Sequence, residues 1–248
     1  MRRIYVAGAF DDPASKELRQ LYETSRHGSL TLLLESDAAI ARRTGKSPKM
    51  NLSERRYFFE AIRFVDKVEE APADPAAAGI PLLDLSGPSF SEAALTGFPY
   101  EAPPVDAPRP AGMKRVVVTG CYDYFHSGHV RFFEEASEYG ELNVVIGSDK
   151  NVRLLKGEGH PLFPETIRRF VVGSCRYVAR CLVSSGKGWL DAEPEIQALE
   201  AERYVVNEDG DKPEKREYCE RNGIEYIVLK RTPKEGLPRR SSTDLRGY

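Results

Sequence analysis

The sequence predicts an α/β fold in two tandem units, each a parallel sheet flanked by helices, with the first unit degenerate. Two observations predict it. Strand-like and helix-like segments alternate along the second half of the 248-residue chain, which is the pattern of parallel sheets with right-handed crossovers. Val6-Ala-Gly-Ala-Phe-Asp11 also matches Val118-Thr-Gly-Cys-Tyr-Asp123 at an offset of 112 residues, which indicates two related units.

In the second unit, continuous apolar runs indicate buried strands, and Pro or Gly marks several helix ends. The predicted strands are Lys114–Val118, Leu142–Gly147, Tyr177–Val183, Arg203–Val206 and Glu225–Leu229. The predicted helices are Gly128–Tyr139, Pro164–Cys175, Glu193–Ala201 and Pro213–Asn222. Ligands of such sheets bind beyond the carboxyl ends of the strands.

A change of composition separates the two units. The segment from Ala71 to Gly112 is rich in Pro and Ala, and such runs favour extended chain. We therefore expect a first domain at 1–97, a linker at 98–112 and a second domain at 113–248. A strand at Ile80–Leu85 could still belong to the first domain.

Composition is that of an ordinary globular protein, with 41% hydrophobic and 30% charged residues. The net charge of −2 gives no case for bulk binding of nucleic acid or an acidic membrane. No signal peptide or membrane-spanning stretch is expected. The four cysteines lack CxxC spacing, so we expect no protein metal site and a reducing, cytoplasmic environment.

The most informative segment is Thr119-Gly-Cys-Tyr-Asp-Tyr-Phe-His-Ser-Gly-His129. It places His126 and His129 where a strand passes into a helix N-terminus, which is a favourable place for phosphate groups. Imidazoles there can donate hydrogen bonds to oxygens that gain charge in a transition state. Near the end of the chain, a Ser-Ser-Thr run at 241–243 offers further donors for the same anion.

These two elements resemble the GxFDxxHxGH signature and the closing Ser-Thr element of the cytidylyltransferase family, within the HxGH nucleotidyltransferase superfamily. The resemblance covers residues 113–248 well and about 1–70 in degenerate form, and it implies Rossmann-like units. The tandem arrangement is similar to that of ethanolamine-phosphate cytidylyltransferase. At the 112-residue offset, however, His126 and His129 correspond to Ala14 and Glu17, so we expect the first unit not to bind triphosphate.

The resemblance implies catalytic roles for His126, His129, Lys156 and Arg240. Lys156 would reach the phosphates from a mobile loop beside Gly157 and Gly159. Arg231 and Arg240 are rival candidates for a phosphate contact, because an insertion separates the arginine from the Ser-Thr element. The implied contacts to nucleotide or acceptor are Gly120, Cys121, Tyr122, Asp123, Gly128, Asp149, Arg168, Trp189, Asp209, Asp211, Ser241, Ser242 and Thr243.

Several of these assignments keep alternatives. Either Asp209 or Asp211 could contact the ligand. Trp189, the chain's single tryptophan, could lie near a cationic acceptor or in the core. Mg²⁺ is expected on the triphosphate, held mainly by phosphate oxygens and water, with Asp123 or Asp149 as outer ligands.

The expected reaction joins CTP and a small phosphorylated alcohol, phosphonate or phosphosugar, with release of pyrophosphate. We favour CTP because the Phe-His-Ser-Gly-His and Cys-Arg-Tyr-Val segments resemble phospholipid-type enzymes. The alternative is ATP, because Leu-Lys-Gly-Glu-Gly-His-Pro resembles heptose-phosphate adenylyltransferases. A non-catalytic nucleotide-binding regulator is a third reading, and a homodimer is possible. Similarity to class I aminoacyl-tRNA synthetases is weak, because the chain has no KMSKS-like loop.

Overall fold

The computed structural model describes residues 2–11, 15–73 and 112–242. They fall into two compact units, and each is considered by itself. Apart from Gly112, the predicted linker at 98–112 lies outside the described residues, as does the predicted strand Ile80–Leu85. None of the helices in the described ranges is long and apolar enough to cross a membrane.

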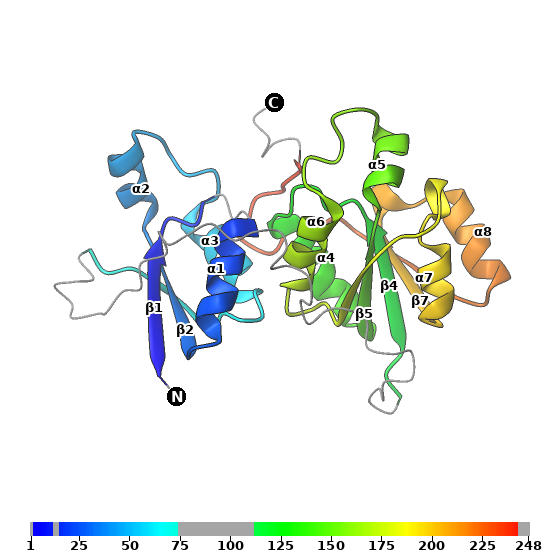
Figure 1. Ribbon diagram of the computed structural model, residues 1–248, viewed down its shortest axis with the longest axis horizontal. Helices are drawn as coiled ribbons and strands as arrows, with labels where there is room; N and C mark the ends of the chain where they lie inside the picture. Colours follow the sequence, from blue (N-terminus) through cyan, green and yellow to red (C-terminus); the bar gives the residue numbers. More distant parts are fainter. Residues whose placement is uncertain (1, 12–14, 74–111, 243–248) are drawn as a thin grey trace. The chain divides into compact units, whose positions relative to one another are not determined.

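The first unit holds a parallel sheet of three strands in the order β1-β2-β3. Its strands are β1 (Arg3–Gly8), β2 (Ser29–Leu34) and β3 (Lys67–Glu70), and its helices are α1 (Ser15–Ser25), α2 (Asp37–Thr44) and α3 (Leu52–Glu60). Helices α1 and α3 lie along one side of the sheet, and α2 lies beyond the carboxyl ends of β1 and β2 (Figure 1).

The second unit holds five parallel strands in the order β6-β5-β4-β7-β8. Its strands are β4 (Arg115–Gly120), β5 (Glu141–Ile146), β6 (Arg180–Val183), β7 (Arg203–Asn207) and β8 (Glu225–Leu229). Its helices are α4 (Ser127–Ser137), α5 (Asp149–Lys156), α6 (Glu165–Gly173), α7 (Glu193–Ala198) and α8 (Pro213–Arg221), with short 3₁₀ turns η2 (Gly188–Leu190) and η3 (Glu208–Gly210).

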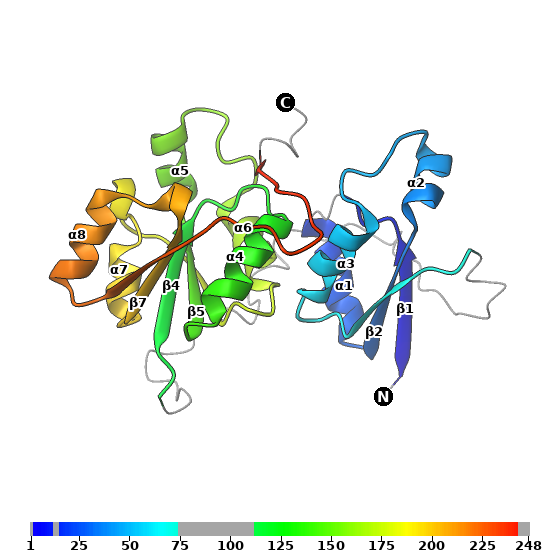
Figure 2. The same cartoon turned by 180° about the vertical axis from the view of Figure 1, so that it is seen from behind.

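Helices cover both faces of this sheet. Helices α4 and α6 lie on one side and α7 and α8 on the other (Figures 1 and 2). Because side chains alternate along a strand, Val117 and Val145 face α7 and α8, where they join an apolar cluster with Ile196, Tyr204 and Cys219. Burial on both faces explains why the apolar runs are continuous: Val116, Val117 and Val118 are all completely buried.

The chain order creates a switch point beside β4. From β4 the chain adds β5 and β6 on one side, and then returns to add β7 and β8 on the other. The connections therefore leave the carboxyl ends of β4 and β7 in opposite directions, which opens a crevice between them. All five predicted strands of this unit are present, and the crevice lies where the sequence predicts ligand binding.

The two largest differences between predicted and observed element boundaries have local reasons. The strand predicted from Tyr177 begins only at Arg180, because Val178 N–H first closes a turn onto the Cys175 carbonyl. The helix predicted to reach Ala201 ends at Ala198, where Glu200 takes a left-handed φ of 47°. Helix α5, which ends at Lys156, has no counterpart among the predicted helices.

A buried arginine ties the strand ends of the second unit together. Arg168 on α6 is only 1% exposed. Its guanidinium donates at 2.7–2.9 Å to the carbonyls of Phe163, Cys121 and Gly147 and to the Asp149 carboxylate. Those four acceptors lie before α6, after β4, after β5 and at the start of α5, so one side chain fixes all of these segments.

The first unit contains a matching arrangement. Arg55 on α3 is fully buried and donates at 2.6–3.0 Å to the carbonyls of Met50, Ala9 and Glu35 and to the Asp37 carboxylate. Each of these residues precedes its counterpart around Arg168 by 112 or 113 positions. The sequence offset is therefore accompanied by the same set of hydrogen bonds.

The turn after the first strand of each unit matches as well. Phe10 and Tyr122 both adopt a left-handed backbone, with φ of 48° and 51°. Asp11 accepts hydrogen bonds from the backbone N–H groups of Lys49 and Met50. Asp123 accepts from those of Leu162 and Phe163. An aspartate in each unit thus holds the segment that leads into the arginine-bearing helix.

We predict that Arg168→Met lowers the free energy of unfolding of the second unit by about 3–5 kcal/mol, because it leaves three carbonyls and a carboxylate without their donor. The measurement is urea denaturation of the full chain, followed by circular dichroism.

The control is Arg169→Met, the neighbouring and less buried arginine. It should change stability by no more than about 0.5 kcal/mol. Equal effects of the two substitutions would show that the hydrogen bonds of Arg168 do not hold the strand ends.

Candidate active site

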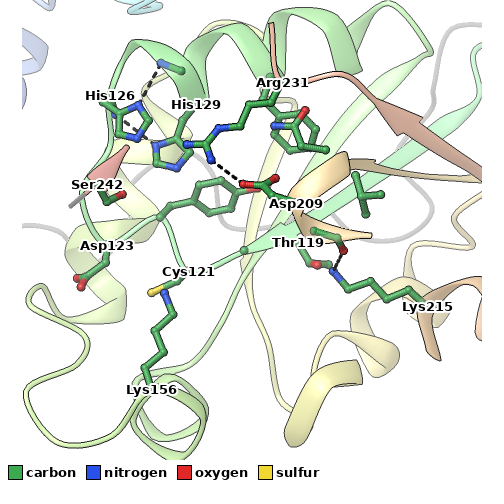
Figure 3. Close-up of a pocket in the computed structure, with 17 residues that line it drawn as sticks. Thr119, Cys121, Asp123, His126, His129, Lys156, Asp209, Lys215, Arg231 and Ser242 are labelled. Carbon is green, nitrogen blue, oxygen red and sulfur yellow. Dashed lines mark hydrogen bonds and ion pairs between the residues drawn. The ribbon is translucent and has the colours of Figure 1, made fainter. Parts of the chain in front are cut away.

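A cavity of about 230 Å³ opens at the carboxyl ends of β4 and β7 (Figure 3). Its walls come from the β4–α4 turn, the start of α4, the end of α5, the β7–α8 segment and the chain after β8. The lining residues are Thr119, Gly120, Cys121, Tyr122, Asp123, His126, Gly128, His129, Phe132, Lys156, Val206, Asn207, Asp209, Gly210, Lys215, Arg231 and Ser242.

Two histidines cap helix α4. The Gly128 N–H donates to Nδ1 of His126 at 3.1 Å, and the His126 N–H donates to Nδ1 of His129 at 3.3 Å. Since Nδ1 accepts in both rings, both imidazoles are neutral tautomers that carry their proton on Nε2. The capping bonds thus turn two helix-terminal side chains into fixed hydrogen-bond donors at the cavity.

Ring packing holds the two imidazoles in place. Their centroids are 4.0 Å apart in a stacked arrangement, and His129 also stacks on Phe125 at 5.5 Å. The Tyr122 ring meets His129 edge-on. Burial is the largest cause that holds the pKa of His129 well below its usual value, and the cationic Arg231 and Lys156 lower it further. His129 is therefore a neutral donor at physiological pH.

The two motif glycines make room for rings. A Cβ on Gly120 would lie 2.8 Å from the Tyr122 ring, and a Cβ on Gly128 would lie 2.9 Å from Cε1 of His126. The absence of a side chain at position 128 is thus explained by the His126 imidazole, which packs against the start of the helix.

Asp123 and Cys121 line the cavity but have restricted chemistry. Both hydrogen bonds to Oδ1 of Asp123 come from the chain before α6, and its side chain is nearly buried. Burial raises the pKa of the Cys121 thiol, so the thiol stays protonated and is a poor nucleophile. Both residues lie in the cavity wall, and the ligand contacts predicted for them remain predictions.

Two predicted ligand contacts, Arg168 and Asp149, are placed elsewhere. Neither lines the cavity. The guanidinium uses four of its five N–H donors on the acceptors described above, and Asp149 is its ion-pair partner at 2.7 Å. Their hydrogen bonds hold the strand ends, so the ligand contacts predicted for them remain predictions.

The cavity distinguishes between the rival charged residues. Arg231 lines it, pairs with Asp209 at 2.7 Å and donates to the backbone carbonyl of Arg240 at 2.9 Å. The Arg240 side chain is not part of the lining, and Asp211 pairs with Arg216 outside it. The geometry therefore favours Arg231 and Asp209 as ligand contacts.

Lys156 contributes from a helix end. It is the last residue of α5, not part of a loop as predicted, and Figure 3 shows its amine directed toward Cys121. Gly157 and Gly159, both with positive φ, follow it. The helix fixes the backbone of Lys156, while its four-carbon side chain remains the adjustable part.

The Ser-Ser-Thr element reaches the cavity through one residue. Ser242 lines it, and its hydroxyl donates to the Tyr124 carbonyl at 3.3 Å. Ser241 is not part of the lining, and Thr243 lies outside the described residues. Trp189 is 60% exposed, so it is not a core residue; the Lys212 amine lies 5.8 Å from its ring centre.

Sequence reasoning missed six lining residues: Thr119, Phe132, Val206, Asn207, Gly210 and Lys215. The end of a strand, where Thr119, Val206 and Asn207 stand, was a usable signal, since ligands bind there. Lys215 lies in the first turn of α8, and nothing in its local sequence separates it from an ordinary surface lysine.

The cavity suits a polyanion better than a bare metal ion. The amines of Lys156 and Lys215 and the guanidinium of Arg231 face two carboxylates, Asp123 and Asp209. In the described ranges, no group of three His, Cys, Asp or Glu residues could hold a metal ion. Any Mg²⁺ would therefore need phosphate oxygens and water as its ligands.

The family model described as "Cytidylyltransferase-like" matches residues 117–246, which include every lining residue. The chain belongs to the cytidylyltransferase-like family. Enzymes of this family transfer nucleotidyl groups, so this protein is a nucleotidyltransferase. The predicted preference for CTP is a separate question that the family model does not answer.

Comparison with curated proteins gives more specific relatives. The chain is 34% identical over 140 residues to the FAD synthase of Aciduliprofundum boonei, which covers 54% of this chain and 85% of that protein. It is 32% identical over 138 residues to the FAD synthase of Archaeoglobus profundus, covering 54% and 84%. It is 36% identical over 87 residues to the bifunctional protein HldE of Geobacter metallireducens, covering 35% of this chain but only 18% of HldE.

Among solved structures, a lipopolysaccharide core biosynthesis protein from Thermoplasma volcanium is 22% identical with a TM-score of 0.42. The match covers 50% of this protein's chain and the whole chain of the Thermoplasma volcanium protein.

We predict that His129 stays neutral, with its proton on Nε2, until the pH falls well below 6.5. NMR titration of the imidazole nitrogens in the free protein checks this. Because the unfolded state takes up the proton near pH 6.5 and the folded state does not, the contribution of His129 to stability falls as the pH drops below 6.5. A titration midpoint at or above 6.5 would contradict the buried, cationic surroundings described here.

Proposed function

We propose that the second unit transfers the AMP group of ATP to a phosphate oxygen of a small phosphorylated acceptor and releases pyrophosphate. The observation that carries this proposal is the pair of Nε2–H donors, His126 and His129, at the start of α4 beside Lys156 and Arg231. Fixed donors and cations around a helix N-terminus suit a triphosphate.

The relatives support ATP over the CTP favoured by the sequence. FAD is riboflavin phosphate joined to AMP by a phosphoanhydride bond, so an enzyme that makes it by nucleotidyl transfer passes on an adenylyl group. Two FAD synthases are matched over most of their length. HldE agrees with the resemblance of the Lys156 segment to heptose-phosphate adenylyltransferases, although only a small part of HldE is matched.

In the proposed reaction an oxygen of the acceptor phosphate attacks the α-phosphorus of ATP. A new P–O bond forms while the bond to the pyrophosphate oxygen breaks, and the electron pair leaves with pyrophosphate. The nucleophile is already an anion, so no side chain has to remove a proton. The task of the protein is to align two anions and to stabilise the charge that builds on the phosphate oxygens.

The described residues divide this task. His126 and His129 donate from Nε2 without a change of protonation state. Lys156 brings a positive charge from the opposite wall, and Arg231 would exchange Asp209 for a phosphate oxygen. Mg²⁺, when bound to the triphosphate, would neutralise part of its charge. Asp123 faces the same cavity but is engaged by two backbone N–H groups.

We further propose that the first unit is a copy of the same fold that has lost its chemistry. The matching hydrogen bonds of Arg55 and Arg168 support common architecture. Glu17 at the position of His129 would place a negative charge where phosphates bind. In this proposal the first unit contributes to the stability or assembly of the protein.

We predict that His126→Ala and His129→Ala each lower kcat with ATP by about a hundredfold or more, comparable to the loss of a fixed oxyanion donor. Pyrophosphate release with ATP and a panel of phosphorylated acceptors measures this. The same assay with CTP compares the two nucleotides.

Thermal unfolding is the control for the histidine variants, since each ring also caps α4. Substitution of Lys150, an exposed residue in the first turn of α5, by Ala should leave turnover unchanged. If the wild-type protein binds nucleotide but turns over none of the acceptors, the protein is a non-catalytic nucleotide-binding regulator and the proposed reaction is wrong.

We predict that the full chain binds one nucleotide. Calorimetric titration with ATP and Mg²⁺ should give a stoichiometry near one nucleotide per chain. The variant Lys156→Ala should keep this stoichiometry, because Lys156 acts mainly in the transition state. Two nucleotides per chain would show that the first unit has kept a working site.

A further inference from the structure

One part of the cavity is not used by the proposed phosphate chemistry. It is formed by Thr119, Val206, Asn207, Gly210 and Lys215, and we call it the β7–α8 corner. Figure 3 shows Thr119 and Lys215 on the far side of Asp209 from His126 and His129. A nucleotide whose phosphates contact the two histidines would extend its base toward such a distant part of the cavity.

Lys215 is placed unfavourably for a purely structural lysine. It stands in the first turn of α8, where the helix dipole disfavours a positive charge. Within the described residues its amine makes one hydrogen bond, a weak one of 3.4 Å to the Gly210 carbonyl. The amine also lies 5.5 Å from the Tyr204 ring centre. A half-buried ammonium with so few partners can donate to a ligand.

Asn207 supplies the complementary group. It is the last residue of β7, and its side-chain oxygen Oδ1 is buried without a hydrogen-bond partner in the described part of the chain. Leaving such an acceptor unsatisfied costs about 1–3 kcal/mol. A ligand N–H group placed in the corner would remove this cost.

The floor of the corner is rigid. The hydroxyl groups of Thr119 and Tyr204 are 2.6 Å apart, and Tyr204 is 1% exposed beneath them. Asn207 and Gly210 lie at the two ends of the η3 turn. The acceptor of Asn207 and the donor of Lys215 therefore belong to one short, well-anchored stretch of structure.

We propose that the β7–α8 corner holds the nucleobase, and that Asn207 and Lys215 select bases with an exocyclic amino group over bases with a keto group at that position. Adenine and cytosine present an amino donor there, which Asn207 would accept, while guanine and uracil present a carbonyl oxygen. The amine of Lys215 would donate to a neighbouring acceptor atom of the base. This inference rests on the proposed function for the placement of the phosphates.

The experiment measures binding of ATP, ITP, CTP and UTP to the full chain with Mg²⁺, by calorimetry. ATP differs from ITP, and CTP from UTP, at the amino or keto group. Wild-type protein should bind each amino nucleotide at least tenfold more tightly than its keto counterpart. Asn207→Leu should reduce that ratio to within about threefold of one, and Lys215→Met should weaken amino-nucleotide binding about tenfold or more.

Lys150→Met is the matched control: it removes an exposed lysine from the first turn of α5 and should leave both affinities and the ratio unchanged. Thermal unfolding of each variant reports on folding, and Lys215→Arg, which keeps a donor, should restore most of the affinity lost in Lys215→Met.

The outcomes separate this inference from the proposed function. Binding with the expected amino preference but without turnover would overturn the proposed function and support the corner as a base site. Turnover by a wild-type protein with equal affinities for ATP and ITP and for CTP and UTP would overturn the corner alone. An unchanged preference in Asn207→Leu, in a folded protein, would overturn it as well.

Discussion

The buried guanidinium of Arg168 is the interaction on which the catalytic unit depends. Parallel strands end at the same edge of a sheet, and their carbonyl groups and following turns must be satisfied there without closing the crevice. Arg168 does this with donors to the segments after β4 and β5 and to the start of α5. The Cys121 carbonyl that it holds belongs to the turn that leads to His126.

Arg55 forms the same arrangement of hydrogen bonds in the first unit. The first unit keeps the arginine, the aspartate partner and the left-handed turn residue, while Glu17 stands at the position of His129. A network of this kind ties the ends of two strands to the starts of two helices.

At the active site, structure and chemistry use the same atoms. The helix N-terminus needs acceptors for its unpaired N–H groups, and the Nδ1 atoms of His126 and His129 are those acceptors. Satisfying the helix fixes the tautomer, which carries its proton on Nε2, in two side chains that line the cavity. The low pKa of His129 has the same origin, since a buried ring beside Arg231 and Lys156 resists a further charge.

The sequence by itself determined the class of fold, the five strands of the second unit and the turn that bears the two histidines. Apolar runs and turn residues report burial and local geometry, which are properties of short segments. Tertiary structure alone decided which charged residues meet. It paired Arg168 with Asp149 at the strand ends, placed Arg231 but not the Arg240 side chain among the lining residues, and brought Asn207 and Lys215 to the cavity. Spacing along the chain could not show this. A guanidinium or an amine can hold backbone carbonyls in place, lie at the surface or contact a ligand, and only the position of its acceptors in space separates these roles.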